Sequence, residues 1–414
     1  MSVPNLDTSP AKIAIEGLGH RGDGIATVAG RPVFVAGALP GEIVLVSGPG
    51  ERPRLAAVID ASPDRVEPPC RHAARCGACV LQHAADGLYS GWKRDLLASA
   101  LAAERIEVDI AATIRVAPGL RRRVTLALAR GPDKRVSLGF HGSRDRAVFA
   151  VEACVVAHPA IVAALPGLSG LLSALAPAKG ERDVTILATT AGLDVWVSGH
   201  VPRDTRRLAE GAGMLGLARL AIGAEVVATF RPPALDVGGV SLVPPPGGFV
   251  QAVGEAEDAL AGIVLGHLAG ARRALDLFSG AGAFALRLAR ATAVHAVEGD
   301  RAALAALDRG WRGAPGLKPV TTETRDLFRV PVTATEIARH DAVVIDPPRQ
   351  GATAQAIELA RSKVSRLAYV SCNPTSFARD AKVLLAGGWK LGTVTPVDQF
   401  LWSSHLELVA TFER

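Results

Sequence analysis

The sequence lacks a long apolar run and a recognisable leader, and both absences bear on where the protein acts. Its longest uncharged stretch, residues 153–178, is broken by Pro159, Pro166 and Pro177. We therefore expect a loop and a buried helix there rather than a membrane span. The first ten residues lack the basic and apolar blocks of a signal peptide. Together these absences predict a cytoplasmic protein with no membrane partner.

Lysine is also scarce. It supplies 8 of the 46 basic residues, so arginine supplies the other 38, and the net charge is +6. Arginine suits phosphate and base recognition better than lysine does, but richness in arginine, alanine and glycine can also follow from genome composition. The excess is therefore weak support for a nucleic-acid partner. A chain of 414 residues that is 49% apolar has ample core for roughly two or three domains.

Cysteine is rare, and five is an odd number. In a cytosolic chain, metal binding or catalysis is then favoured over disulfides. Cys70, Cys76 and Cys79 have the spacing C-x5-C-x2-C, and Cys154 lies 75 residues beyond Cys79. Four thiolates suit zinc or an iron–sulfur cluster. Zinc ribbons usually pair two short C-x2-C units, so three close cysteines and a remote one favour a cluster over zinc or over buried thiols without a ligand.

The fifth cysteine follows one of two apolar runs that have the length of buried parallel strands, residues 341–345 and 366–370. Each run ends in a polar loop with proline, and these loops carry Asp346 and Cys372. Open α/β sheets place their ligands at the carboxyl ends of parallel strands, so we expect this carboxylate and this thiol at neighbouring strand ends. Cys372 could be a small buried hydrophobe, but its position after a strand favours a nucleophile.

The chain divides into segments with different patterns. Short runs within residues 11–60, separated by Gly, Pro or Asp, predict a small β-barrel of a kind that often binds oligonucleotides. Residues 88–105 look like one amphipathic helix, and prolines mark a linker near residues 231–248. We predict a barrel over residues 7–62, a central metal- and RNA-binding domain over 63–248, and a catalytic domain over 249–414 on which the 88–105 helix could pack.

Residues 119–150 are expected to form strands with a strong basic accent. The basic residues there are Arg121, Arg122, Arg123, Arg130, Lys134, Arg135, Arg144 and Arg146. They make the best candidate in the chain for a nucleic-acid contact. A solvated charged face is an equally open reading of such a run.

A glycine turn marks the start of the predicted catalytic domain. Residues 273–278 predict a strand, and Gly280 and Gly282 follow in the turn to the next helix. Missing side chains let a cofactor approach the backbone there, although tight turns need glycine in any case. The next expected strand, residues 293–297, ends at Glu298, where an acidic residue can hold ribose hydroxyls.

Two further acidic residues follow along the chain. Asp326 lies near a third expected strand end, where it could meet a cofactor base or could serve as a helix N-cap. A last strand is expected over residues 405–412 and carries Glu407. Spacing alone does not distinguish Glu407 from a solvent-facing residue.

Together these features resemble the bacterial RNA (uracil-5-)-methyltransferase family over nearly the whole chain. GLGHRGDGIA and FVAGALPGE resemble its TRAM domain, the first four cysteines resemble its 4Fe-4S ligands, and DLFSGAGAF, IDPPRQG, VSCNP and HLELVATF resemble its catalytic motifs. The resemblance implies an α/β protein. It would combine an N-terminal OB-like TRAM barrel, a central α+β domain and a Rossmann-like class I methyltransferase domain.

The resemblance also implies partners and roles. S-adenosyl-L-methionine would be the methyl donor, and the substrate would be RNA, with 23S rRNA favoured over tRNA and the enzyme acting as a monomer. The 4Fe-4S ligands would be Cys70, Cys76, Cys79 and Cys154. The cofactor and uridine site would comprise Gln251, Phe278, Gly280, Gly282, Glu298, Asp326 and Asp346. Cys372 would be the nucleophile and Glu407 the base.

The implied chemistry explains why a cysteine is needed. Carbon 5 of uracil is too weak a nucleophile to take a methyl group directly, and addition of the Cys372 thiolate to carbon 6 makes carbon 5 enolate-like. Glu407 would then remove the carbon-5 proton, and Arg349 is a candidate for helping the thiol to ionise. This chain has Ala283 and Val253 where the family usually has asparagine.

Three other functions compete with this one. An amino-group methyltransferase of the Asp-Pro-Pro-aromatic type needs no cysteine, and here Arg349 replaces the aromatic residue. A cytosine-5 RNA methyltransferase often uses a second catalytic cysteine, and none is spare if four serve a cluster. A non-catalytic iron–sulfur protein that binds RNA would not bind S-adenosyl-L-methionine.

Overall fold

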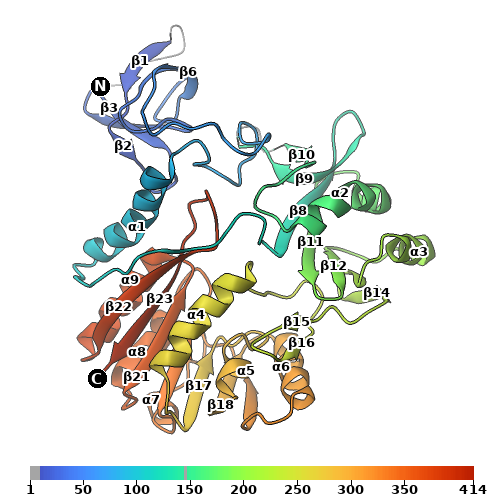
Figure 1. Cartoon of the computed structure of the whole chain (residues 1–414), viewed down its shortest axis with the longest axis vertical. Helices are drawn as coiled ribbons and strands as arrows, with labels where there is room; N and C mark the ends of the chain where they lie inside the picture. The colour runs from blue at the N-terminus through green and yellow to red at the C-terminus, as the bar shows by residue number, and fades with distance from the viewer. Residues whose placement is uncertain (1–9, 144–146) are drawn as a thin grey trace. The chain divides into compact units, whose positions relative to one another are not determined.

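The computed structural model describes residues 10–143 and 147–414. The chain forms two compact units. The first comprises residues 1–96, 141–147 and 400–405, and the second comprises residues 97–140, 148–399 and 406–414. Figure 1 follows the chain from the N-terminus in blue to the C-terminus in red. Within the described residues, no helix is long and apolar enough to cross a membrane.

The first unit begins with the predicted β-barrel, built from two three-stranded sheets. One has the order β1 (Ala11–Ala14), β5 (Ile43–Ser47), β6 (Arg54–Asp60), and the other β2 (Gly17–Leu18), β3 (Gly24–Val28), β4 (Arg31–Val35). Buried residues from both sheets share one core: Ile15, Ala26, Val33, Val35, Ala38, Val44 and Val46. The predicted strands are confirmed, and only the two-residue β2 was not foreseen.

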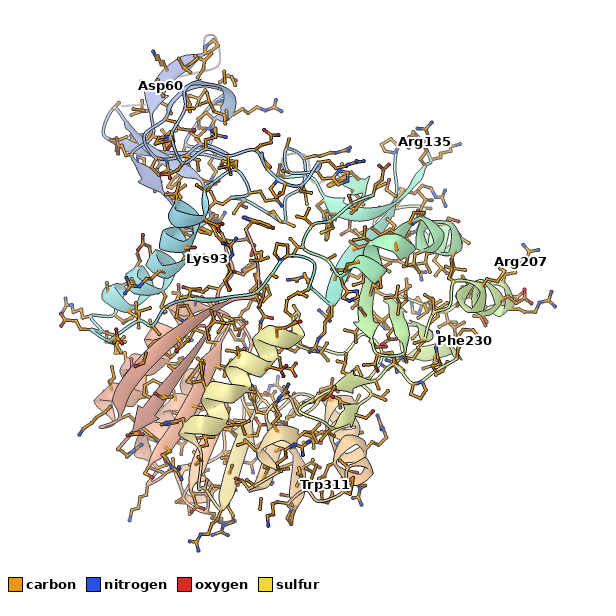
Figure 2. The ribbon with its side chains drawn as sticks, viewed as in Figure 1. Asp60, Lys93, Arg135, Arg207, Phe230 and Trp311 are labelled. Carbon is orange, nitrogen blue, oxygen red and sulfur yellow. The ribbon has the colours of Figure 1, made fainter. Side chains whose placement is uncertain are left out.

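The cysteine-rich segment of the first unit is held by two distant pieces of chain. Gly77 N donates to His141 O at 3.2 Å, and Val80 N donates to Trp402 O at 2.7 Å. Helix α1 (Asp86–Ala103) adds Lys93, labelled in Figure 2, which is buried with its ammonium hydrogen-bonded to the carbonyls of Phe400 and His405. Residues 400–405 are therefore anchored beside the segment that carries Cys79.

The central part of the chain forms a seven-stranded sheet. Its order is β10 (Val148–Ala150), β9 (Val136–His141), β8 (Arg123–Arg130), β11 (Glu181–Thr189), β12 (Gly192–Val197), β13 (Arg219–Ile222), β14 (Glu225–Thr229). The accompanying elements are α2 (Pro159–Leu172), η1 (Ser173–Leu175) and α3 (Arg206–Met214). Helix α2 buries Ile161, Leu165, Leu168 and Leu172, which confirms the buried helix predicted within residues 153–178. The hairpin β15 (Leu235–Asp236) and β16 (Ser241–Leu242) lies within the predicted linker.

The basic residues within 119–150 do not form one continuous basic surface. Arg135, labelled in Figure 2, is exposed at the tip of the β8–β9 hairpin. Arg122 instead forms an ion pair with the buried carboxylate of Glu257 at 2.7 Å. Arg122 is therefore largely committed to the interior rather than to a partner. Arg144 and Arg146 lie outside the described residues.

The C-terminal part of the chain, joined by β7, forms an eight-stranded sheet. Its order is β19 (Val320–Thr324), β18 (Ala293–Glu298), β17 (Arg273–Leu277), β20 (Ala342–Ile345), β21 (Arg366–Ser371), β23 (Glu407–Glu413), β22 (Lys390–Asp398), β7 (Ile114–Arg115). From β19 to β21 all neighbours are parallel, and β23 is antiparallel to both β21 and β22. Its helices are α4 (Gly254–His267), α5 (Ala285–Leu288), α6 (Arg301–Gly313), α7 (Ala334–Ile337), α8 (Thr353–Arg361) and α9 (Pro374–Ala386).

The sequence pattern explains this sheet. All four residues of β20 are buried, as a parallel strand covered on both faces requires. Leu275 and Leu277 of β17 share a core with Leu359 of α8 and Phe377 of α9, and Leu97 of α1 joins them. Figure 1 shows α4 crossing the sheet beside β23. The predicted Rossmann-like arrangement of parallel strands and helices is confirmed, and the sheet fixes where the strand-end loops meet.

Candidate active site

The predicted polar residues converge at one edge of the catalytic sheet. Phe278 follows β17, Glu298 ends β18, Asp346 follows β20 and Cys372 follows β21. These strands are parallel, so their carboxyl ends share that edge. Glu407 joins them by register, because Ser371 pairs with Leu408 in the antiparallel β21–β23 ladder. The next pair of positions along that ladder brings Glu407 opposite Cys372.

The two proline-marked loops are tied to each other. Asn373 Nδ2 donates to Arg349 O at 2.8 Å, and its side chain also caps α9 by accepting from Thr375 N at 3.1 Å. Behind them, the buried carboxylate of Asp380 accepts from Ala352 N at 2.6 Å and from the Tyr369 hydroxyl at 2.8 Å. These bonds fix the loop after β20 against the helix that follows Cys372.

A line of hydrogen bonds joins the two buried carboxyl groups of the site. Gln251 Nε2 donates to Asp346 Oδ2 at 3.3 Å. Gln399 Nε2 donates to Gln251 Oε1 and to Glu407 Oε2, both at 2.9 Å. Gln251, Gln399 and Glu407 are all buried, with Gln399 fully inaccessible. The sequence singled out Gln251 and Glu407 but not Gln399.

Burial raises the pKa of each carboxyl group in this line. Burial and the charge of Asp346 raise the pKa of Glu407, which the Gln399 amide and the Arg349 charge oppose. Burial and the charge of Glu257 raise the pKa of Asp346, which the Gln251 amide opposes. A carboxyl group whose pKa moves toward neutrality is suited to accept a proton during a reaction.

The Cys372 thiol is harder to ionise than the sequence suggested. Burial, followed by the charges of Glu407 and Asp346, raises its pKa to about 11. Arg349 acts in the expected direction and lowers the pKa, but its effect is outweighed. The expected direction of the Arg349 effect is therefore confirmed, but burial and the two carboxylates together hold the pKa of the thiol above its ordinary value.

The glycine turn after β17 is shaped for two different reasons. Gly282 has φ +99°, and a Cβ there would lie 2.8 Å from the Leu307 side chain, so this glycine serves packing. Gly280 has φ +53°, and a Cβ there would meet nothing within 4 Å. Its backbone N–H donates to Glu298 Oε2 at 3.0 Å. The space over Gly280 is the kind of cradle in which a bound cofactor can approach the backbone.

Buried polar atoms lie beside this turn. The hydroxyl of Ser279 has no hydrogen-bond partner among the described residues. The carboxylate of Asp276 makes no close hydrogen bond there, although the backbone N–H of Ala285 acts to lower its pKa. Asp276 is fully buried, and burial together with the charge of Asp346 raises its pKa well above the usual range. Unpaired buried polar groups are costly, so they mark a place where a ligand would supply the missing partners.

Two predicted residues both contact Phe328. Phe278 has φ +59°, and its ring is tilted against Phe328 with the centroids 5.2 Å apart. Asp326 is exposed, and its Oδ1 accepts from Phe328 N at 3.0 Å and Arg329 N at 3.4 Å. Asp326 thus caps its own turn, and its Oδ2 lies 3.7 Å from the guanidinium of Arg329, so the structure uses it as the N-cap that the sequence left open as an alternative.

Sequence reasoning missed the clamp that supports Gln251. Arg122 donates to Gln251 O at 3.1 Å and to Glu257 Oε2 at 2.7 Å. Arg287 donates to the other oxygen of Glu257 at 2.7 Å. The sequence gave no signal that the arginine run carrying Arg122 would meet the helix carrying Glu257, because the two residues lie 135 positions apart.

The four cysteines proposed as cluster ligands are half-buried. Cys70, Cys76 and Cys79 belong to the first unit and Cys154 to the second. Across residues 10–143 and 147–414, no group of three or more His, Cys, Asp or Glu side chains is arranged to hold a metal ion. The predicted iron–sulfur cluster is therefore not shown by the described residues.

Comparisons with known proteins place the chain. The family described as tRNA (Uracil-5-)-methyltransferase matches residues 314–414, and the TRAM domain matches residues 11–47. An uncharacterised RNA methyltransferase of Rhizobium meliloti is 44% identical, over 98% of this chain and 100% of its own. A 23S rRNA (uracil(1939)-C(5))-methyltransferase of Pectobacterium atrosepticum is 34% identical, over 97% and 94%.

A solved structure has the same fold. The tRNA (uracil-54, C5)-methyltransferase of Pyrococcus abyssi, in complex with S-adenosyl-L-homocysteine, superposes with a TM-score of 0.74 at 22% identity, covering 97% of this chain and 100% of that one. The sequence relatives and the domain matches agree with the fold and with the resemblance seen in the motifs. This chain belongs to the RNA (uracil-5-)-methyltransferase family.

Proposed function

We propose that this protein transfers a methyl group from S-adenosyl-L-methionine to carbon 5 of a uridine in RNA, through a covalent adduct with Cys372. The observation that carries the proposal is the meeting of Cys372, Glu407 and Asp346 at one edge of the sheet, where the charges of both carboxylates act on the thiol. An amino-group methyltransferase would have no use for that thiol.

The strand-end residues are suited to hold the methyl donor. S-adenosyl-L-methionine supplies, when bound, an electrophilic methyl group on a positively charged sulfur. We assign it to the open space over Gly280, with Glu298 toward the ribose and Phe278 beside the base. Burial disfavours the charged forms of Asp276 and Asp346, and a positively charged ligand nearby would favour those forms.

The remaining residues account for the uracil chemistry. The Cys372 thiolate adds to carbon 6, and the electron pair of the 5,6 double bond makes carbon 5 nucleophilic toward the methyl group. Glu407 then accepts the carbon-5 proton, the double bond re-forms, and the bond from sulfur to carbon 6 breaks to return the thiolate. Because the resting thiol is protonated, its proton must leave within the complex, and Glu407 and Asp346 are the nearest acceptors that act on it.

The target uridine must reach a half-buried sulfur atom. A base stacked inside a helix cannot do so, and enzymes that modify a base take it out of the stack or use a single strand. We therefore propose an unpaired or flipped-out uridine. The TRAM-matched barrel and Arg135 are candidate contacts for the surrounding RNA.

We favour 23S rRNA as the substrate, because a relative with this specificity shares 34% identity over 97% of the chain. tRNA is the second candidate, because a family described by tRNA methylation matches the last 101 residues, 314–414. Mapping 5-methyluridine in both RNAs from a deletion strain should show loss at one position, and the purified protein should restore it. Loss of no such nucleotide would contradict the proposal.

A separate measurement tests the non-catalytic alternative. Calorimetric titration with S-adenosyl-L-methionine should show binding to the free protein, because the space over Gly280 is open in the absence of a ligand. A protein that only binds RNA through a cluster would give no heat. RNA binding without cofactor binding would therefore favour that alternative.

We further propose that Cys70, Cys76, Cys79 and Cys154 bind a 4Fe-4S cluster of structural role. Support comes from the cluster-like spacing of the four cysteines and from their half-buried positions. Metal binding is coupled to the folding of the segments that carry the ligands, so loss of the cluster should also lower stability. Protein purified without oxygen should contain roughly four iron ions per chain and absorb near 400 nm. Cys76→Ser should remove both signals, whereas Cys372→Ser, the matched control, should retain them.

A further inference from the structure

Gln399 is a buried side chain that the assigned chemistry does not use. It follows β22 and is fully inaccessible to solvent. Its Nε2 donates to Glu407 Oε2 and to Gln251 Oε1 at 2.9 Å each. Its own Oε1 is buried with no hydrogen-bond partner among the residues that the structure describes. One amide group thus serves two partners and leaves an acceptor unpaired.

We propose that Gln399 is a positioning residue that aims the Glu407 carboxylate at the substrate and, through Gln251, joins it to Asp346 in one line. This inference rests on the proposed function, since it gives Gln399 a part in the same reaction. Gln399 is placed behind Glu407 and Gln251 and acts through them, so no contact with the substrate is assigned to it.

The orientation of the amide supports the proposal. With its NH2 group toward Glu407 and Gln251, Gln399 offers one donor to each of two acceptor oxygens. A flipped amide would set its oxygen against both of them and would also release Gln251. Gln251 Oε1 accepts from Gln399 while its Nε2 donates to Asp346, so the first amide determines which way the second one points. The unpaired Oε1 of Gln399 is the cost of that choice.

The charges facing Glu407 determine the expected sign of a change. Asp346 raises the pKa of Glu407, whereas Arg349 and the Gln399 amide lower it, and Cys372 interacts with it from the end of β21. Glu407 accepts a proton only when it is ionised, so the rate rises with pH through the pKa of this group. Removing the Gln399 donor raises that pKa, and the acid limb of the pH–rate profile moves to higher pH.

The test is Gln399→Met, which keeps the length of the side chain and removes its donor. We expect kcat to fall roughly tenfold at neutral pH while KM for RNA stays within about twofold. The reason is that Gln399 contacts Glu407, the group that accepts the proton, and does not contact RNA. The acid limb should move upward as derived above. If this variant does not fold, Gln399→Asn carries the same test, since the shorter side chain draws the amide away from both partners.

Gln355→Met is the matched control. Gln355 is also a fully buried glutamine. Its Oε1 accepts from Val332 N at 2.8 Å, and its Nε2 donates to Val332 O at 2.9 Å. Losing it should lower the melting temperature but leave the acid limb in place. Thermal unfolding of both variants separates loss of stability from loss of positioning.

The outcomes separate this inference from the proposed function. A folded Gln399→Met protein with unchanged kcat and an unchanged acid limb overturns the role of Gln399 while wild-type methylation stands. A wild-type protein that releases no tritium from RNA carrying 5-tritiated uridine instead overturns the proposed function itself. Further support would come from Gln399→Met leaving the yield of covalent RNA adduct unchanged in a Glu407→Gln background, because residues that act through one another are not additive. A large loss of adduct in the folded double variant would contradict the proposal.

Discussion

Replacing Cys372 with alanine should abolish methyl transfer while RNA binding survives. Without the sulfur atom, carbon 5 of uracil keeps its low reactivity, and removal of a covalent nucleophile typically costs at least ~10³-fold in rate. RNA binding should persist because the substitution removes one half-buried atom and no positive charge. Transfer of a labelled methyl group to RNA, and RNA retention on a filter, measure the two properties separately.

The control for this variant changes a residue three positions along the chain. Thr375→Ala changes an exposed side chain in the first turn of α9, next to the cap made by Asn373, and should leave both properties near the wild-type level. Retained turnover in Cys372→Ala would reject the nucleophile. Joint loss of turnover and RNA binding in that variant would point to a structural role for the thiol.

The raised pKa of Cys372 also bears on how the nucleophile forms. A thiol with a pKa of about 11 is almost fully protonated at pH 7, so the nucleophile forms only when its proton is removed within the complex. A bound sulfonium would favour the thiolate by its charge, in the sense opposite to Glu407 and Asp346. Glu407 and Asp346, whose charges disfavour the thiolate, are also the groups able to receive the thiol proton.

The sequence predicted those parts of the site that depend on strand ends. A buried parallel strand has a continuous apolar pattern, and the residue that follows it lies at the ligand edge of the sheet. The positions of Asp346, Cys372 and Glu298 therefore follow from the order of residues along the chain. Glu407 could be placed only through the family resemblance, because an antiparallel register is needed to set it opposite Cys372.

The contacts between distant side chains could not be predicted in this way. Gln399 follows a strand of unremarkable composition, and its role depends on where β22 stands beside β23. Arg122 was assigned to a basic surface, yet it pairs with Glu257, which lies 135 residues away. A charge pattern reports composition along the chain, whereas the partner of a charge is determined by packing.

Replacing Glu407 with glutamine should trap RNA covalently on the protein. The thiol adds before Glu407 is needed, and the raised pKa of Cys372 is due in part to the Glu407 charge, so a neutral amide at position 407 should make the thiolate easier to form. Without a base, the carbon-5 proton stays in place and the sulfur cannot leave. The adduct should then accumulate as a shifted band on a denaturing gel.

The matched control for this trap is Glu413→Gln at the other end of the same strand. The side chain of Glu413 is 69% exposed and lies 3.7 Å from His267, so its charge is remote from the reaction and its loss should leave turnover unchanged with no shifted band. The trapped band should also disappear when Cys372→Ala is combined with Glu407→Gln, because the linkage then has no sulfur. Two results would show that Glu407 is not the group that removes the proton: normal turnover of Glu407→Gln, or loss of activity in the folded variant without any shifted band. Asp346 would then be the candidate, because it is the other carboxylate among the described residues whose charge acts on the Cys372 thiol.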